Sequence, residues 1–260
     1  MTAKSALVLE NRSALVTGGA RGIGAAIAAD LADRGAQVMI ADIDGDLAEE
    51  TAAAMRAEGR AVTAFACDLA QQTQIDALAA ALPKLDILVN NAAILDATPI
   101  GALTRSRFGQ VQQINQDAVL WVTLAMLPRL RASRHGRVVN IASIMGLRGG
   151  ADSVPYATAK GGVVNMTRSL AVDLAADGIL VNCLCPGFVD TRMAILPDGS
   201  GHEHETDSFR DIYLKYGRIP LRRVATPQDV ARATAFFCGD DCAYVTGQIL
   251  VVDGGLSATF

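Results

Sequence analysis

Apolar runs alternate with helical patterns along almost the whole chain. Short apolar runs predict buried strands over residues 13–17, 37–41, 61–66, 84–90, 136–142, 179–185 and 249–252. Between these runs, apolar residues recur at helical spacing and predict helices over residues 23–34, 47–57, 73–82, 105–131, 156–176 and 227–238. Strands that alternate with helices through short connections form a parallel sheet covered on both faces. The pattern therefore predicts an α/β fold, a doubly wound parallel sheet of about seven strands flanked by helices on both faces.

One segment, residues 192–222, departs from this alternation. It is polar and mixed, and helical spacing resumes only after Thr226-Pro227. Threonine followed by proline is typical of a helix start. Insertions of this length inside a domain are commonly functional, so we interpret residues 192–222 as a substrate lid on a single domain that spans residues 1–260.

The composition predicts a globular protein that binds small molecules. The chain has 260 residues, of which 51% are hydrophobic, enough to bury a large core. Its net charge of -4 and pI near 5.4 leave no basic stripe for nucleic acid or an anionic membrane. The apolar run near the N-terminus is too short for a signal peptide, and no run approaches the length of a membrane span. We therefore expect a cytoplasmic protein with no nucleic-acid or membrane partner.

The cysteines and histidines predict neither a disulfide framework nor a metal centre. The five cysteines, Cys67, Cys183, Cys185, Cys238 and Cys242, are odd in number and lack two paired C-x-x-C units. His202 and His204 alternate with glutamates in a glycine-flanked loop. Such loops are more often solvated lids than metal sites, so we predict no metal.

A glycine-rich stretch follows the first predicted strand and opens the first predicted helix. It reads Thr17-Gly-Gly-Ala-Arg-Gly-Ile-Gly24, with the spacing Gly-x-x-x-Gly-x-Gly. Glycines at such a position let backbone N–H groups and the positive end of the helix dipole approach a pyrophosphate. The alternative is an ordinary tight turn, but the place between a strand and a helix favours a nucleotide site.

Asp42, which ends the second predicted strand, bears on the choice of nucleotide. It lies twenty positions after Gly22, where an acidic residue is expected to hold the hydroxyls of the adenosine ribose. A carboxylate there would repel the 2′-phosphate of NADP by ~4 kcal/mol at an effective dielectric constant of ~20. Arg21 favours the opposite choice, because a basic residue in the glycine loop can reach a 2′-phosphate. We predict NAD over NADP because Asp42 would meet the phosphate directly.

Further polar residues follow the third and fourth predicted strands. Asp68-Leu69 and Asn90-Asn91-Ala92 lie at the predicted carboxyl edge of the sheet, where ligands bind in open α/β folds. The alternatives are structural, with Asp68 as a helix cap and the asparagines as a turn whose amides bond to the backbone.

Tyr156 and Lys160 stand four positions apart at the start of a predicted helix. This spacing places both side chains on one helical face, where the ammonium would lie near the phenol and lower its pKa. Such a pair is suited to proton transfer. Taken alone, the spacing more often marks an exposed tyrosine and a solvated lysine on an ordinary helix.

In combination, these motifs resemble those of the short-chain dehydrogenase/reductase family over about residues 10–255. The resemblance rests on residues in the family's order, namely Thr17–Gly24, Asp68, Asn90-Asn91-Ala92, Asn115, Ser143, Tyr156, Lys160, Pro186-Gly187 with Thr191, and Asp253-Gly254-Gly255. It implies a single-domain Rossmann-type fold and an NAD(P)-dependent enzyme that acts on CH–OH groups.

The resemblance also implies roles for individual residues. Tyr156 would be the general acid/base, Lys160 would lower its pKa and hold the nicotinamide ribose, and Ser143 would steady the substrate oxygen. Asn115 would bend its helix and hold a water that relays protons to the lysine. The cofactor-binding residues it implies are Gly18, Arg21, Gly22, Ile23, Gly24, Asp42, Ile43, Asp68, Leu69, Asn91, Ala92, Tyr156, Lys160, Pro186, Gly187, Val189 and Thr191. The substrate pocket it implies comprises Ser143, Met145, Ser153, Tyr156 and Phe188.

The function expected from these residues is the interconversion of a secondary alcohol and its ketone by hydride transfer to or from NAD. The alcohol would be a sugar, a polyol, a hydroxy acid or a cyclic alcohol, and the resemblance implies a homotetramer or homodimer. One alternative is an NADPH-dependent reductase of 3-oxoacyl thioesters, such as 3-oxoacyl-acyl carrier protein. The other is a non-catalytic, nucleotide-sensing scaffold, which the presence of Ser143, Tyr156 and Lys160 disfavours.

Overall fold

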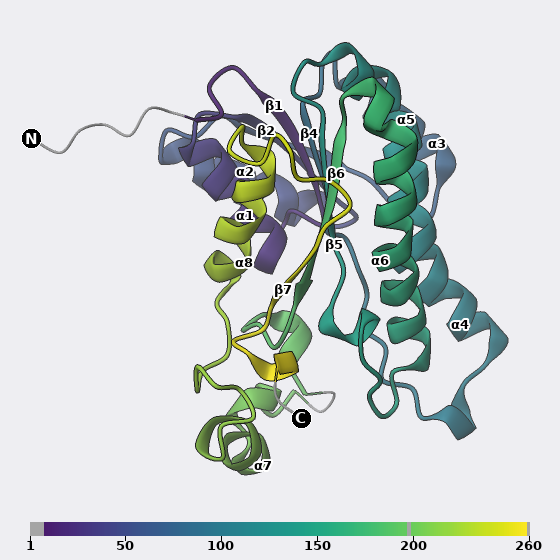
Figure 1. Cartoon of the computed structure of the whole chain (residues 1–260), viewed down its shortest axis with the longest axis vertical. Helices are drawn as coiled ribbons and strands as arrows, with labels where there is room; N and C mark the ends of the chain where they lie inside the picture. Colours follow the sequence, from purple (N-terminus) through teal and green to yellow (C-terminus); the bar gives the residue numbers. More distant parts are fainter. Residues whose placement is uncertain (1–7, 197–198, 259–260) are drawn as a thin grey trace, which may run out of the picture.

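Seven parallel strands form one sheet in the computed structural model, which describes residues 8–196 and 199–258 (Figure 1). Their order is β3-β2-β1-β4-β5-β6-β7, and every neighbouring pair is parallel. The strands are β1 Ser13–Thr17, β2 Gln37–Asp42, β3 Val62–Ala66, β4 Ile87–Asn90, β5 Arg137–Ile141, β6 Leu180–Pro186 and β7 Ile249–Val252. The predicted fold class, a Rossmann-type doubly wound sheet in a single domain, is confirmed.

Only the fourth strand is clearly shorter than predicted, since it begins at Ile87 instead of Lys84. The residues before it are held at the amino edge of the sheet by polar contacts. The Lys84 ammonium donates to the Asn11 carbonyl at 3.0 Å, and an Asp86 carboxylate oxygen accepts from the Ser13 backbone N–H at 2.8 Å. Residues 84–86 with these contacts lie outside the regular strand.

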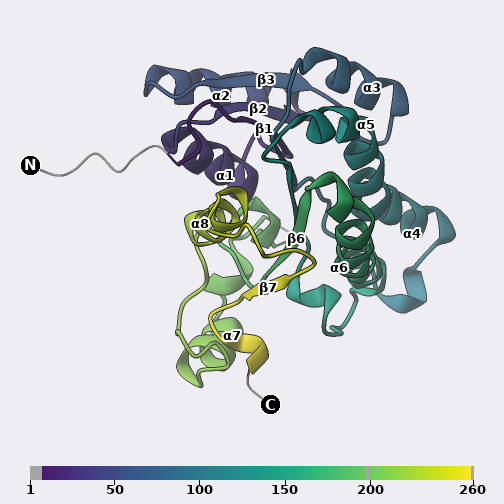
Figure 2. The same cartoon turned by 45° about the horizontal axis from the view of Figure 1, so that its top comes forward.

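Helices cover both faces of the sheet (Figure 2). The main helices are α1 Gly22–Asp33, α2 Gly45–Ala57, α3 Gln72–Ala81, α4 Arg105–Gln112, α5 Ala118–Ala132, α6 Val154–Leu174 and α8 Pro227–Cys238. One face carries α1, α2 and α8, and the other carries α3, α4, α5 and α6. The sheet is therefore enclosed, which explains why its strands read as nearly continuous apolar runs.

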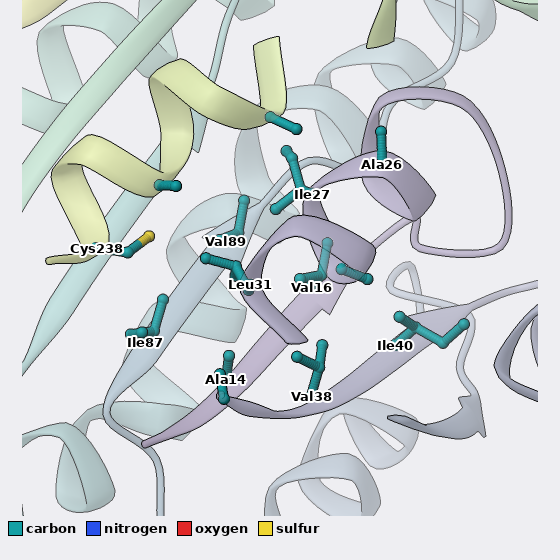
Figure 3. Close-up of a cluster of buried hydrophobic side chains, with 14 of the residues drawn as sticks. Ala14, Val16, Ala26, Ile27, Leu31, Val38, Ile40, Ile87, Val89 and Cys238 are labelled. Atoms are coloured by element: carbon teal, nitrogen blue, oxygen red, sulfur yellow. The ribbon is translucent and has the colours of Figure 1, made fainter. Parts of the chain in front are cut away.

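Alternate residues of β1 enter two separate cores. Val16 packs with Ile27 and Leu31 of α1 on one face (Figure 3), and all three are fully buried. Leu15 faces the opposite layer and packs in the core that contains Met126 of α5. Burying each such side chain stabilises the fold by roughly 1.5–3 kcal/mol. The strand is therefore held from both sides, and its carboxyl end is a rigid platform.

The helix predicted over residues 105–131 is interrupted in the structure. A π-helical segment, Gln113–Asp117, separates α4 from α5. The side chain of Asn115 explains the interruption, because its Oδ1 accepts from the Ile94 N–H and its Nδ2 donates to the Ile94 carbonyl, both at 2.8 Å. Such single-turn widenings of a helix occur frequently at functional sites.

The order of the strands reverses between β1 and β4. The chain runs outward from β1 to β3 in one direction and from β4 to β7 in the other. Loops that leave β1 and β4 therefore diverge and leave a crevice at the carboxyl edge, the usual ligand site of such sheets. Among the described helices, none is both long and apolar enough to cross a membrane.

The described parts of the predicted lid, residues 192–196 and 199–222, form a series of short turns below the sheet in Figure 1. The segment contains 3₁₀ turns at Arg192–Ala194 and Glu203–Glu205, the short helix α7 Asp207–Phe209 and a π-helical turn Arg210–Lys215. Phe209 is buried, which anchors this polar stretch to the rest of the molecule. The start of α8 is as predicted, with the Thr226 hydroxyl accepting from the Asp229 N–H.

Candidate active site

The glycine loop packs tightly against the segment that follows β4. The side-chain amide of Asn91 donates to the carbonyls of Thr17 and Gly18, both at 3.0 Å. The Thr17 hydroxyl accepts from the N–H groups of Asn91 and Ala92. A Cβ on Gly18 would come within 2.8 Å of the Ala92 Cα, and Gly18 adopts a φ of +63° that favours glycine. The loop needs glycine here both for its turn and for this close approach.

The N-terminus of α1 leaves its first backbone N–H groups available. Arg21 occupies the N-cap position and makes no side-chain capping bond. Gly22 has a φ of +56°, and Ile23 packs partly against the core. Uncapped N–H groups together with the helix dipole suit an anion such as a pyrophosphate.

Asp42 and Arg21, which favour different nucleotides, both contact a third residue, Asp44. Asp42 accepts hydrogen bonds from the N–H groups of Ala20 at 3.0 Å and Asp44 at 3.1 Å. The guanidinium of Arg21 forms a salt bridge of 2.6 Å with the carboxylate of Asp44. Ile43, next to Asp42, is 72% exposed, a high value for so apolar a residue. Arg21 is therefore engaged by Asp44, a residue that the sequence analysis did not single out.

Asp68 and Leu69 lie where the third strand reaches the same edge. The Asp68 carboxylate accepts from the Ala70 N–H at 2.9 Å, so it shapes the turn that leads to α3. Leu69 lines a narrow hollow together with Thr17 and Ala92. The fold thus brings the ends of β1, β3 and β4 together.

Ser143 and Tyr156 are brought together by a close contact between two backbones. Ser143 precedes the 3₁₀ turn Ile144–Gly146, and its hydroxyl accepts from the Met145 N–H at 3.1 Å. This turn lies directly on α6, because a Cβ on Gly146 would come within 2.7 Å of the Lys160 carbonyl carbon. The contact fixes the serine beside the first turns of the helix that carries Tyr156.

Lys160 is buried beneath Tyr156. Its ammonium donates to the Ile141 carbonyl at the end of β5 at 2.8 Å and lies 5.8 Å from the centre of the Tyr156 ring. Burial lowers the pKa of Lys160 to about 8. An ordinary solvated lysine, the structural alternative for this residue, is therefore excluded by its position.

The pKa of Tyr156 shifts in the direction opposite to the sequence-based expectation. Burial is the largest cause and raises this pKa to about 12, whereas the Ser143 side chain, which interacts with the phenol, lowers it. Lys160 was expected to lower the pKa of Tyr156, but its charge does not contribute to this shift. Desolvation outweighs the attraction that the spacing of four residues suggested.

The segment after β6 connects the cofactor residues with the lid. Gly187 approaches the closing loop so closely that a Cβ would lie 2.7 Å from the Asp253 Cβ. Val189 forms an isolated β-bridge with Ala225, which lies three residues after the end of the lid. The Thr191 methyl lies 3.4 Å from the position of a Cβ on Gly22. Pro186, the last residue of β6, starts this segment at the sheet edge.

The predicted pocket residues divide into two groups. Phe188 contacts two lid aromatics, with ring centres 4.9 Å from those of both Phe209 and Tyr213. Met145 and Ser153 belong to the loop between β5 and α6, where the Ser153 hydroxyl donates to the Gly150 carbonyl at 2.7 Å. The bound hydroxyl makes Ser153 a residue that shapes this loop.

Thr17 and Asp44 support the site without having been predicted from sequence as single residues. The sequence contains only a weak signal for each of them. Thr17 is a hydroxyl residue that ends a buried strand, and Asp44 is an acidic residue directly before a helix. Both are common for purely structural reasons.

Comparisons with known proteins agree with this geometry. The family model described as enoyl-(acyl carrier protein) reductase matches residues 18–257. The chain is 39% identical to cis-4-hydroxycyclohexanecarboxylate dehydrogenase of Sinomonas cyclohexanicum, covering 95% of this chain and 97% of that protein. It is 33% identical to a 3-oxoacyl-[acyl-carrier-protein] reductase of Chlamydia trachomatis, covering 96% of this chain and 99% of that protein.

Solved structures are similar along the whole chain. One from Beutenbergia cavernae, described as an NAD(P)-dependent gluconate 5-dehydrogenase with NADP bound at low occupancy, has a TM-score of 0.89 and 34% identity. The match covers 98% of this chain and 100% of that one.

Proposed function

The chain belongs to the short-chain dehydrogenase/reductase family, and from this premise we propose that it interconverts a secondary alcohol and its ketone with NAD(H). As a member of the family it is an oxidoreductase that acts on CH–OH groups with a nicotinamide dinucleotide. The observation that supports the proposal best is the arrangement of Ser143, Tyr156 and buried Lys160 at the carboxyl edge of the sheet. Hydroxy acids and cyclic alcohols are favoured substrates, because the names of similar proteins include a hydroxycyclohexanecarboxylate and gluconate.

In the oxidising direction, Tyr156 is a phenolate and accepts the hydroxyl proton of the alcohol. When bound, NAD would supply the acceptor for the hydride that leaves the carbinol carbon, while the hydroxyl proton goes to the phenolate oxygen of Tyr156. The Ser143 hydroxyl donates to the substrate oxygen while charge develops there. The Lys160 ammonium, held by the Ile141 carbonyl, would hold the nicotinamide ribose of bound NAD. In reduction, Tyr156 returns the proton to the oxygen of the ketone.

The rate of alcohol oxidation is expected to rise with pH between about pH 6 and about pH 9. Tyr156 must be deprotonated to accept the proton, and its pKa is raised to about 12, so the phenolate fraction grows throughout this range. Because the pKa of Lys160 is lowered to about 8, its charge is lost toward the upper end of this range, which weakens its hold on the nicotinamide ribose and slows the rise. Reduction uses the protonated phenol, and its rate should stay nearly constant.

A screen of secondary alcohols with NAD at alkaline pH, in which the formation of NADH is measured, tests both the activity and this profile. Oxidation that slows as the pH rises would contradict the assignment.

The preference for NAD is a further part of the proposal. It is supported by the carboxylate of Asp42 at the end of β2, which would repel a 2′-phosphate, and by the salt bridge of Arg21 with Asp44, which engages the guanidinium. Asp42→Asn removes the charge and is expected to raise the ratio of kcat/KM with NADPH to kcat/KM with NADH by about 10–100-fold. This factor corresponds to a part of the ~4 kcal/mol repulsion between the carboxylate and a 2′-phosphate. Steady-state rates with both dinucleotides measure the change. Asp46→Asn, at an exposed carboxylate in the first turn of α2, is the matched control.

An NADPH-dependent reduction of 3-oxoacyl thioesters is the second candidate. It is favoured by the similarity to 3-oxoacyl-[acyl-carrier-protein] reductases. Wild-type protein that reduces a 3-oxoacyl thioester faster with NADPH than with NADH would decide for this reaction and against the role proposed for Asp42.

We also infer a homotetramer. Exposed apolar side chains lie on α5 and α6, with Trp121 at 47% and Val172 at 77% exposure, and on α8 and β7, with Phe236 at 48% and Leu250 at 39%. Two such surfaces on one chain suit an assembly with two kinds of interface. The cytoplasmic location stays a prediction from the sequence.

A further inference from the structure

Three potential metal ligands meet between the lid and the segment after β6. Oxygen or nitrogen atoms of Asp190, His202 and His204 all lie within 4.8 Å of one another. The Nδ1 atom of His202 is 3.2 Å from Oδ1 of Asp190, and the Nε2 atom of His204 is 3.6 Å from the same oxygen. Within residues 8–196 and 199–258, no other group of three such side chains converges in this way.

One of these atoms is buried and makes no hydrogen bond. Nδ1 of His202 is the sole buried side-chain nitrogen or oxygen without a hydrogen-bond partner among the described residues. It faces the Asp190 carboxylate at contact distance, but the geometry is not that of a hydrogen bond. Leaving a buried polar atom unsatisfied is unfavourable, and a cation between the two groups would remove that penalty.

The distances suit a small transition-metal ion. At a tetrahedral zinc ion, with bonds of about 2.0–2.2 Å, neighbouring ligand atoms lie roughly 3.3–3.5 Å apart. The two measured distances to the Asp190 oxygen are close to this spacing. Two imidazoles and one carboxylate suit zinc and its neighbours better than magnesium or calcium, which prefer oxygen ligands.

Backbone contacts around His202 and His204 keep the two histidines near each other. Ile195 and His202 form an isolated antiparallel bridge, so the chain returns to the segment that carries Asp190. The carboxylate of Glu205 accepts from the His202 N–H at 3.1 Å and orients the turn that separates the two histidines. Supporting contacts of this kind hold metal ligands in position.

We propose that Asp190, His202 and His204 bind a zinc-like divalent ion that fastens the lid to the cofactor-binding segment. Asp190 is adjacent to Thr191, which lies beside the glycine loop. The His204 ring lies 6.4 Å from that of Phe209, which in turn contacts Phe188. Binding the ion therefore orders the lid aromatics over the expected substrate pocket. The ion takes no part in hydride transfer, and the effect on substrate binding, unlike the metal site itself, rests on the proposed function.

The sequence analysis predicted no metal site here, and the reason is the position of Asp190. The two histidines alone, separated by one glutamate, are typical of a solvated loop. Asp190 lies twelve residues before His202 and joins the group only in the tertiary structure, where Ile195 pairs with His202.

Metal binding to the full chain tests the proposal directly. Protein freed of metal with a chelator is titrated with Zn²⁺ by calorimetry and with Co²⁺ by visible absorption. We expect one ion per chain, the spectrum of a tetrahedral or five-coordinate site, and a Tm that rises by about 5 °C at a hundredfold excess over Kd. Each of Asp190→Asn, His202→Gln and His204→Gln is expected to weaken binding by at least about 30-fold.

His135→Gln is the matched control. His135 also faces a carboxylate, with its Nδ1 atom 3.5 Å from Asp240, but this pair has no second histidine. Its replacement should leave zinc affinity and the Tm shift unchanged. Zinc binding that survives in all three site variants, for example at cysteines, or no stoichiometric binding by the wild type, would overturn the proposal. Because affinity and Tm are measured without substrate, the result stands apart from the outcome of the activity assays.

The kinetic consequence is measured once a substrate is known. Zinc should lower the KM of wild-type protein several-fold with little change in kcat, because it orders the lid without touching the reacting atoms. The same addition should leave the KM of His204→Gln unchanged. An equal zinc effect on both proteins would refute the role of this site in the lid.

Discussion

Replacing Tyr156 with phenylalanine is expected to lower kcat/KM by about 10³-fold or more while NADH still binds. The substitution removes the one hydroxyl that exchanges a proton with the substrate oxygen. It leaves the ring in place above Lys160, and the Ser143 hydroxyl keeps its bond to the Met145 N–H. The fold and the dinucleotide site should therefore be intact, and the loss should appear in the turnover of either reaction direction.

Tyr244→Phe is the control for this experiment, because Tyr244 is fully exposed and far in sequence from the site. Turnover, NADH fluorescence and Tm are measured for both variants and the wild type. Wild-type-like turnover of Tyr156→Phe would remove this tyrosine from the mechanism. A large fall in Tm would show that the hydroxyl is needed for folding and that the loss of activity is not specific.

Substituting Gly24 with alanine should disrupt the nucleotide site from within. The added Cβ would overlap the Gly18 carbonyl oxygen and lie 2.6 Å from the Asn91 amide nitrogen. Both groups belong to the bonded junction of the glycine loop with the segment after β4, so neither can move alone. Overpacking of this kind costs roughly 1–3 kcal/mol, which corresponds to a Tm lower by about 2–6 °C in a chain of 260 residues. NADH binding should weaken at least about tenfold, because the loop would no longer approach the pyrophosphate.

Gly101→Ala provides the comparison. Gly101 lies in a 3₁₀ turn, Ile100–Ala102, and a Cβ there would meet nothing within 4 Å. This variant should match the wild type in both Tm and NADH affinity, as measured by thermal unfolding and fluorescence titration. Equal behaviour of the two alanine variants would mean that Gly24 is not held in the close contact described.

The parallel sheet was predictable because strands that are buried on both faces consist of nearly continuous apolar residues. The run Ser13–Thr17 is buried at every position, and its length, with the helix that follows, is enough to indicate a parallel strand. The break between α4 and α5 was not predictable from hydrophobic spacing. It depends on the bond of Asn115 to Ile94, a contact between residues twenty-one positions apart.

The interaction partner of Arg21, which bears on the preference for NAD or NADP, was also not predictable from the sequence. Both residues can be read from the sequence, but only the structure shows that the Arg21 guanidinium forms a salt bridge with Asp44. A salt bridge between partly exposed groups depends on the approach of two loops, and no local pattern records it.

The amino-acid sequence by itself determined the order of strands and helices, the glycine loop and the spacing of Tyr156 and Lys160, since each depends on neighbours within a few residues. Only the tertiary structure decided the direction in which the pKa of Tyr156 shifts, because the desolvation arises from segments distant in sequence. It also decided that His202 and His204 meet Asp190, since a fold-back of the lid brings the carboxylate to them.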